Sequence, residues 1–516
     1  MALLDVYSKP LTAAQAAHLL RRATFGPTPE QIRAFTGLTA DQAVAQLLAN
    51  QPLPAPPLDP ETGKSFHDLP YDRVKNGKLG TYLKNWWTGL MLNQPASLVE
   101  KVTLFWSNHF VTGQVTVSDY RYTYQYNALL RQHALGNFRA FTVAVSQNPA
   151  MLRYLNGNQN VLGKPNENYA RELQELFTIG RGGNYTEEDV RQAARVLTGW
   201  ADAGYRDDKT GEVKTAFRPA QHDPGDKPFS AAYQNAVIKG RTGANAGLDE
   251  LNDLVDLILK QPETARAICR ELYRWFVNSD LKPEVETGFI VPLAEVFRAG
   301  NFEIKPVLSA LFRSTHFFDS ALQGAVIKAP TDLVLGTLRF FGTKSADMTA
   351  NPTAFYQVTG YLYRSLREQQ QDLLDPPTVF GWSAYYQGDY YQQWINANTL
   401  GIRGSYSDNL TNGSAKTAGK PLFDPLPYVK TLSDPSDPTK LVDELTTALM
   451  AFPLTREQKD FLIDNVLLDG LPRYEWYPEW NDYVRAPNDP AKLKAVQGKL
   501  NTLLQYIFRL AEYQVC

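Results

Sequence analysis

The chain has 516 residues, of which 43% are hydrophobic and 21% charged, a balance typical of a folded protein that excludes wholesale disorder. The formal net charge of −2 provides no positive field of the kind that nucleic-acid-binding proteins use, so we expect no nucleic-acid partner. No stretch reaches about 18 uninterrupted apolar residues, which predicts no membrane span. Two cysteines, Cys269 and Cys516, are too few for a disulfide framework.

The first ten residues lack the basic start and the continuous apolar core of a signal peptide. This absence favours a cytoplasmic protein. The alternative is a periplasmic or extracellular protein from which a leader has been removed.

Helical periodicity runs through most of the first 200 residues, interrupted by a proline-rich link at 49–64. The helical region 79–110 is expected to be divided near Pro95 into two helices, each with large hydrophobic residues. The predicted segments are two helices within 12–48, two within 79–110, and single helices at 120–135, 138–147, 166–180 and 186–200.

Residues 201–247 lose this periodicity and contain two short β-like runs, 213–217 and 236–238, which predict a small β-hairpin insertion. A second interruption, the aromatic-rich stretch 376–440, is expected to be a long loop excursion. The remaining predicted helices are 248–259, 264–278, 284–299, 304–311, one beginning at 329–330, 441–450 and 491–514. The fold class predicted is mainly α: one large domain over 1–516, an irregular multi-helix bundle with a small β-hairpin insertion and long aromatic-rich loops.

The segment around the predicted 166–180 helix carries the most unusual set of polar residues. Glu172 and Glu175 are three residues apart and therefore project from one helical face, while Asn166 lies at the helix start. Helical bundles hold metal ions with carboxylates placed in this way. The alternative is a solvated acidic face, or ion pairs with arginines such as Arg171 and Arg191.

Two histidines are further candidates. His109 follows Asn108 at the end of a helix with a large aromatic face and could act as a ligand, a general base or a satisfied core histidine. His222 and Asp223, with Asp226, lie on a turn in the irregular insertion and could supply metal or catalytic groups. The alternative, turn formation by aspartates, explains Asp223 and Asp226 but leaves His222 unexplained.

The aromatic-rich excursion contains Trp382, Trp394 and Asn396. Rings that cover sugar faces and amides that bind hydroxyls are typical of carbohydrate sites, although a loop pinned by tryptophan and proline has the same composition. The sequence contains no Gly-x-Ser-x-Gly elbow, no P-loop and no His-Glu-x-x-His motif, which argues against a serine hydrolase or nucleotide enzyme of familiar design.

Seven segments in order together resemble the bacterial family labelled "domain of unknown function 1800". They are Ala17 to Pro27, Phe105 to Phe110, Asn166 to Leu173, Tyr185 to Val190, Leu197 to Trp200, His222-Asp223, and Pro376 through Trp382 to Asn396. The resemblance implies a mainly helical, often exported protein with no settled activity. Its members often occur beside genes of a sulfatase-like family, which implies a sulfatase-like partner and the processing of an extracellular polymer. The chain departs from the family pattern at Ser107 and Phe177, where the family usually has histidine.

Two hypotheses follow. In the first, the protein is a hydrolase-like enzyme acting on a polar polymer such as a polysaccharide, and catalytic His109, Glu172, Glu175 and His222 converge on one pocket. The same four residues with Asp223 would hold a divalent metal ion, or would act without it as acid and base. The expected substrate-binding residues are Asn166, Arg171, Trp382, Trp394 and Asn396. In the second, a non-catalytic binding or assembly protein uses a buried Asn/Glu/Arg network to fix its helix packing.

Overall fold

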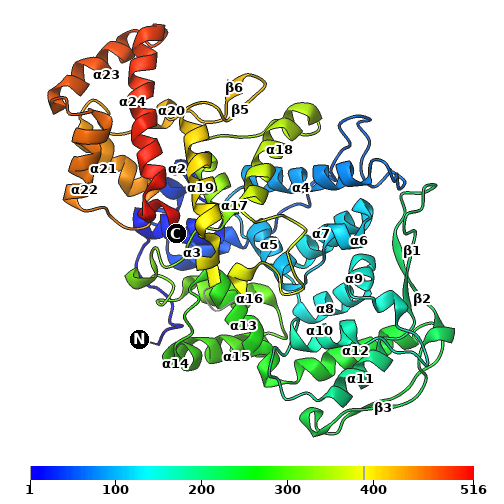
Figure 1. Cartoon of the computed structure of the whole chain (residues 1–516). Helices are drawn as coiled ribbons and strands as arrows, with labels where there is room; N and C mark the ends of the chain where they lie inside the picture. Colours follow the sequence, from blue (N-terminus) through cyan, green and yellow to red (C-terminus); the bar gives the residue numbers. More distant parts are fainter. Residues whose placement is uncertain (1, 387–389) are drawn as a thin grey trace.

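A computed structural model describes residues 2–386 and 390–516. Helices make up most of its regular structure, and the described strands form three separate two-stranded antiparallel sheets (Figure 1). The predicted mainly α class is therefore confirmed. No described helix is both long and apolar enough to cross a membrane.

The N-terminal region forms three short helices where two were expected. They are α1 (Ala13–Ala23), α2 (Pro29–Phe35) and α3 (Ala40–Leu47). A threonine begins each helix and exchanges hydrogen bonds with a glutamine three residues later, so each start is fixed by a capping box. The third box, Thr39 with Gln42, was the signal that separates α3 from α2.

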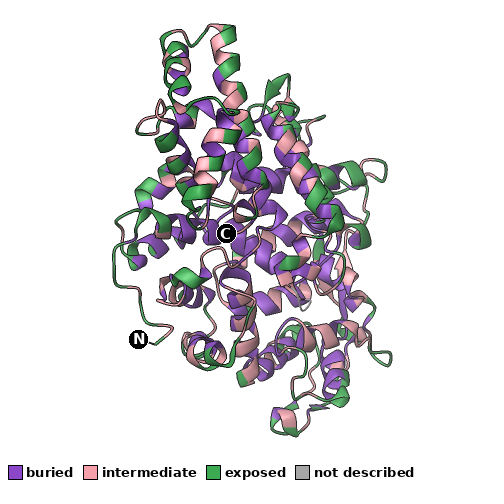
Figure 2. Ribbon diagram, turned by 60° about the vertical axis from the view of Figure 1, so that its left-hand side comes forward, coloured by how far each residue is buried: buried purple, intermediate pink, exposed green. Residues whose placement is uncertain are grey.

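The next six helices lie around the buried centre of the molecule. They are α4 (Asn76–Asn93), α5 (Val99–His109), α6 (Gln114–Val117), α7 (Tyr120–His133), α8 (Phe138–Gln147) and α9 (Pro149–Tyr154). Buried residues gather in the centre of the molecule (Figure 2). Helix α5 is buried from Glu100 to its last residue, His109. The predicted link at 49–64 contains no helix.

The predicted insertion contains four short strands in two sheets. Strand β1 (Trp200–Ala203) pairs with β2 (Lys214–Phe217), and β3 (Lys227–Pro228) pairs with β4 (Val237–Ile238). Helices α10 (Asn168–Glu175) and α11 (Glu187–Val196) precede these strands. Helix α10 ends five residues earlier than predicted, and residues of the turn that follows it line a cavity.

Five helices form the region below the centre in Figure 1. They are α12 (Ala246–Leu259), α13 (Pro262–Phe276), α14 (Pro283–Val285), α15 (Val291–Ala299) and α16 (Ile304–Arg313), with the π-helical segment η4 (Glu286–Ile290) between α14 and α15. The buried face of α13 carries Ile268, Leu272 and Phe276, and the opposite edge of the helix carries charged residues.

The last third of the chain begins with α17 (Pro330–Phe340), α18 (Pro352–Glu368) and α19 (Ala397–Thr411), followed by the β5 (Lys416–Thr417) and β6 (Lys420–Pro421) pair. Because α19 and part of the following structure lie within 376–440, that excursion is less irregular than predicted. The chain then forms an upright group of helices at the upper left of Figure 1 before its end returns to the centre. The group comprises α20 (Leu426–Val429), α21 (Pro438–Leu449), α22 (Arg456–Phe461), the π-helical η8 (Leu462–Leu467), α23 (Trp476–Arg485) and α24 (Pro490–Arg509).

Short 3₁₀ turns complete the described structure. They are η1 (Gly157–Gln159), η2 (Pro219–Gln221), η3 (Ala231–Tyr233), η5 (Ser320–Leu322), η6 (Ser383–Tyr385), η7 (Tyr390–Trp394), η9 (Arg473–Glu475) and η10 (Ala511–Gln514).

Candidate functional site

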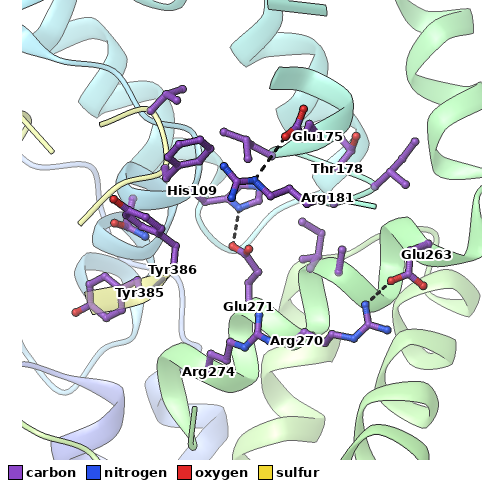
Figure 3. A pocket seen from close by; sticks show the side chains of 18 of the residues that line it. His109, Glu175, Thr178, Arg181, Glu263, Arg270, Glu271, Arg274, Tyr385 and Tyr386 are labelled. Atoms are coloured by element: carbon purple, nitrogen blue, oxygen red, sulfur yellow. Dashed lines mark hydrogen bonds and ion pairs between the residues drawn. The ribbon is translucent and has the colours of Figure 1, made fainter. Parts of the chain in front are cut away.

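A cavity of about 310 Å³ opens where the end of α5, the turn after α10, one edge of α13 and the segment around η6 meet (Figure 3). Its polar lining brings together histidine, carboxylates, arginines and tyrosine hydroxyls. These residues are Asn108, His109, Glu175, Thr178, Arg181, Glu263, Arg270, Glu271, Arg274, Tyr385, Tyr386 and Tyr390. We refer to it as the main cavity.

His109, the last residue of α5, lies in the wall of the main cavity between two acceptors. Its Nδ1 atom is 3.0 Å from Glu271 Oε2, and its Nε2 atom is 3.0 Å from the main-chain oxygen of Phe177. A neutral imidazole has one N–H, so only an imidazolium can donate to both oxygens. Both ring nitrogens are therefore used by the protein, and His109 is placed to hold other groups rather than to react.

His109 forms its side-chain hydrogen bond with Glu271, a residue that the sequence analysis did not single out. The side chain of Glu271 is 44% exposed, whereas that of His109 is 3% exposed, so the pair joins a buried ring to a carboxylate that faces the cavity. Helical spacing on α13 places Arg270, Glu271 and Arg274 on the cavity edge. Nothing in the sequence distinguishes Glu271 from other charges of this amphipathic helix.

Three arginines bring positive charge to the main cavity. Arg270 is bound by Glu263 and Glu286, and these hydrogen bonds raise its pKa above the ordinary value. The guanidinium of Arg181 lies 3.5 Å from Glu175 and 4.0 Å from the ring centre of Phe380. Within the described structure, Arg274 Nε has no hydrogen-bond acceptor, so this arginine retains a free donor.

The two predicted glutamates of α10 lie in different surroundings. Glu175 lines the main cavity and faces Arg181. Glu172 is not in the lining. Burial, followed by repulsion from Glu175, raises the pKa of Glu172.

Asn166 and Arg171 lie outside the lining of the main cavity. Asn166 forms a local turn in which its side chain accepts from the Asn168 amide. Arg171 pairs with Glu187 at 2.6 Å and with Glu167 at 3.3 Å, all with partly exposed side chains. Neither partner is Glu172 or Glu175, the glutamates for which ion pairs with arginine were the alternative.

His222 and Asp223 belong to a separate polar cluster beside α11 and α12. His222 Nε2 lies 3.1 Å from Glu250 Oε1, and the other Glu250 oxygen lies 2.5 Å from Lys227 Nζ. All three side chains are almost fully buried. Asp223 forms an ion pair with Arg195 at 2.7 Å. Of the four residues predicted to converge on one pocket, the structure therefore brings only His109 and Glu175 into the lining of the main cavity.

The ligands expected for a divalent metal ion are not gathered in one place. Across residues 2–386 and 390–516, no group of three or more His, Cys, Asp or Glu side chains is placed to hold a metal ion. The residues that line the main cavity thus do not fit a metal centre, and the metal ion stays a prediction from the sequence.

The residues expected to bind a sugar from the aromatic-rich stretch have structural contacts. Trp382 and Trp394 are 2% and 4% exposed, so neither presents a ring face to solvent. The Trp382 amide donates to Asn108 Oδ1 at 2.9 Å, and Asn396 caps the start of α19. The aromatic residues of this stretch that line the main cavity include Phe380, Tyr385 and Tyr386 instead of the two tryptophans.

Residues 18–515 match the family described as "Protein of unknown function (DUF1800)". The chain belongs to the DUF1800 family. The predicted resemblance is therefore confirmed over nearly the whole chain. No curated protein and no solved structure matched the chain.

One of the two positions at which this DUF1800 member was expected to depart from the family pattern lies between Leu176 and Thr178, which line the main cavity. Phe177 is fully buried, its ring centre lies 6.1 Å from that of His109, and its main-chain oxygen accepts from the histidine. Ser107 is also buried, within α5. In this chain, His109 is consequently surrounded by rings and oxygen acceptors instead of by further imidazoles.

Proposed function

We propose that the protein is a hydrolase-like enzyme that cleaves a polar polymer by acid/base chemistry in the main cavity. The observation that carries this proposal is the His109–Glu271 pair, in which a buried ring holds a half-exposed carboxylate at the wall of a cavity. A general base needs an oriented group within reach of the proton that it removes, and Glu271 meets this need.

In this proposal, one oxygen of Glu271 is bound to His109 and the other accepts a proton from the attacking water. The hydrogen bond from His109 would fix the direction of the carboxylate, so His109 is a positioning residue. Glu175, which comes to the same cavity from α10, would return a proton to the leaving group. Glu172, near Glu175, would tune the charge of that carboxylate without reaching the substrate.

The lining also supports a class of substrate. Arg181 and Arg274 offer guanidinium donors, which bind carboxylate and sulfate groups well, while Tyr386 and Phe380 offer ring faces. We therefore propose an acidic polysaccharide as the polymer. A sulfatase-like partner, which the family resemblance implied, would act on the same class of substrate.

The test is hydrolysis of polyuronate and sulfated polysaccharides, measured as the release of reducing ends. Neutral dextran is the comparison substrate. The Glu271→Gln variant keeps the size of the side chain and is expected to reduce the rate by at least about a hundredfold. Glu284→Gln, a change at an exposed glutamate of α14, is the matched control. Equal rates for both variants would refute the role of Glu271.

The second candidate is a non-catalytic binding or assembly protein. The His222–Glu250–Lys227 cluster favours it, because the buried Lys227–Glu250 ion pair joins β3 to helix α12, with His222 Nε2 3.1 Å from the same carboxylate. This candidate predicts that an acidic polymer binds without being cleaved. Arg274→Gln would then weaken binding, and Glu271→Gln would leave it unchanged or stronger.

A further inference from the structure

A second, much smaller cavity lies where α1, α5, α13, α17 and the η7 segment meet. Its volume is about 20 Å³, enough for one water-sized species. Tyr385 lines this small cavity and the main cavity, so the two are neighbours. Arg21 and Arg22, from the first of the segments that carry the family resemblance, belong to its wall.

The charges around the small cavity do not balance. Lys101 pairs with Asp332, and Arg22 donates to the main-chain oxygens of Phe276 and Val277 at 2.9 and 2.8 Å. Arg21 has one hydrogen bond, to the oxygen of Ala448 at 2.6 Å. In the described structure, neither Arg21 nor Arg22 has an aspartate or glutamate partner.

Two more cations lie just behind the wall. Arg403 donates to the main-chain oxygen of Lys328 at 3.1 Å, and the Lys328 ammonium lies 3.7 Å from the ring centre of Tyr513. Burial, followed by repulsion from Arg21, lowers the pKa of Lys328 to about 7. Burial also lowers the pKa of Arg21 and of Arg403 to about 10. Cations exceed anions here even when the carboxyl group of Cys516, beside Arg22, is counted with Asp332.

The small cavity also has donors that no described residue uses, the indole Nε1 atoms of Trp275 and Trp394. Trp275 is 8% exposed and lines it, and within the described structure the indole Nε1 atom has no acceptor. Arg403 Nη1 behind the wall likewise has no acceptor among the described residues. Buried donors normally have partners, so an acceptor at this place would complete the site.

We propose that the small cavity binds a single chloride-sized monovalent anion, held by the Trp275 indole N–H and the Arg21 guanidinium. The small volume favours a compact ion, and the surplus of cations favours an anion over water. The ion links α1 to α13 and supports Tyr385 from behind. This site does not depend on the function proposed for the main cavity.

The direct test is a crystal of the full chain grown in sodium bromide, with diffraction collected at the bromine absorption edge. A single anomalous peak is expected in the small cavity, within hydrogen-bond distance of Trp275 Nε1. Water density without an anomalous peak at that place would overturn the proposal.

Thermal unfolding in sodium chloride and in sodium gluconate, at equal ionic strength, tests the site in solution. Chloride is expected to raise the Tm in a saturable way, because it binds the folded state. Trp275→Phe keeps a ring but removes the donor, and should increase the half-saturating chloride concentration at least about tenfold. Trp200→Phe is the matched control, since it removes another buried indole N–H that lacks an acceptor among the described residues and lies outside the small cavity. An equal Tm in both salts would overturn the proposal. If Trp275→Phe fails to fold, the anomalous signal of the wild-type bromide crystal tests the proposal.

Discussion

The imidazole of His109 lies 3.0 Å from a carboxylate oxygen of Glu271, although the two residues are 162 positions apart in the chain. The same ring reaches the main-chain oxygen of Phe177 at 3.0 Å. One side chain therefore connects α5, the turn after α10 and α13. This connection both builds the wall of the main cavity and fixes the direction of Glu271.

Replacing His109 with leucine should lower the stability of the fold. The change removes two hydrogen bonds and leaves the buried Phe177 oxygen without its donor, at an expected cost of about 2–4 kcal/mol in the free energy of unfolding. Urea unfolding followed by circular dichroism measures this cost. His67→Leu, at an exposed histidine, is the control and should change stability little. Similar losses for both variants would contradict a structural role for His109.

Gly381 should not tolerate alanine, because two independent constraints meet there. Its φ angle is +90°, and a Cβ atom would lie 2.2 Å from Asn108 Oδ1, the same oxygen that accepts from the Trp382 amide. Gly413 has a φ of +75° but open space around it, so Gly413→Ala isolates the backbone strain. We expect Gly381→Ala to cost at least about 1 kcal/mol more than Gly413→Ala. Equal values of Tm for the two variants would show that Asn108 moves aside freely.

Glu250 should be essential for stability, since it balances buried His222 and Lys227. Glu250→Gln leaves the Lys227 ammonium without a carboxylate, and we expect a loss of about 3–5 kcal/mol in the free energy of unfolding. The matched control is Glu212→Gln, which breaks an ion pair with Lys214 whose side chains are about 60% exposed. Chemical unfolding of both variants provides the comparison. A cost for Glu250→Gln as small as that of the control would mean that water replaces the carboxylate.

Lys328 should make stability depend on pH in the alkaline range. Its pKa falls from 10.5 to about 7 in the folded protein, so the charged form is penalised on folding. The penalty is complete below pH 7 and disappears as the pH rises to 10.5, because the unfolded chain binds the extra proton in this window. Relative to Lys328→Met, the wild type should therefore gain about 1 kcal/mol per pH unit between pH 7 and 10.

Unfolding of both proteins across this pH range, in a buffer without chloride, measures the difference. Arg403→Met also removes a buried cation, and it serves as the control below pH 9 because the pKa of Arg403 is about 10 in the folded protein. A constant difference between wild type and Lys328→Met would show that the lysine stays charged in the folded protein.

Local patterns determined a large part of the fold. Periodic apolar residues predicted most helices, because burial of one face is decided by neighbours three and four positions away. Capping boxes set helix starts at Thr12, Thr28, Thr39 and Thr186. The boundary between α2 and α3 was missed, although it was also local and could have been found from Thr39 and Gln42. Helices α18 and α23 were not predicted either.

The site was predicted only in part, for a physical reason. His109 and Glu175 carried local signals and do line the main cavity, whereas Glu271 had none, because its importance comes from an imidazole supplied by a distant helix. His222 seemed to lack a structural partner in the sequence until the fold brought Glu250 to it.

The sequence by itself determined the helical class, the family and the places where helices begin, since these depend on short-range periodicity and on motifs in order. Only the tertiary structure decided which polar residues share a cavity and which satisfy one another inside the core. A buried charge takes its properties from the groups that folding places within a few ångströms of it, and no spacing along the chain specifies those groups.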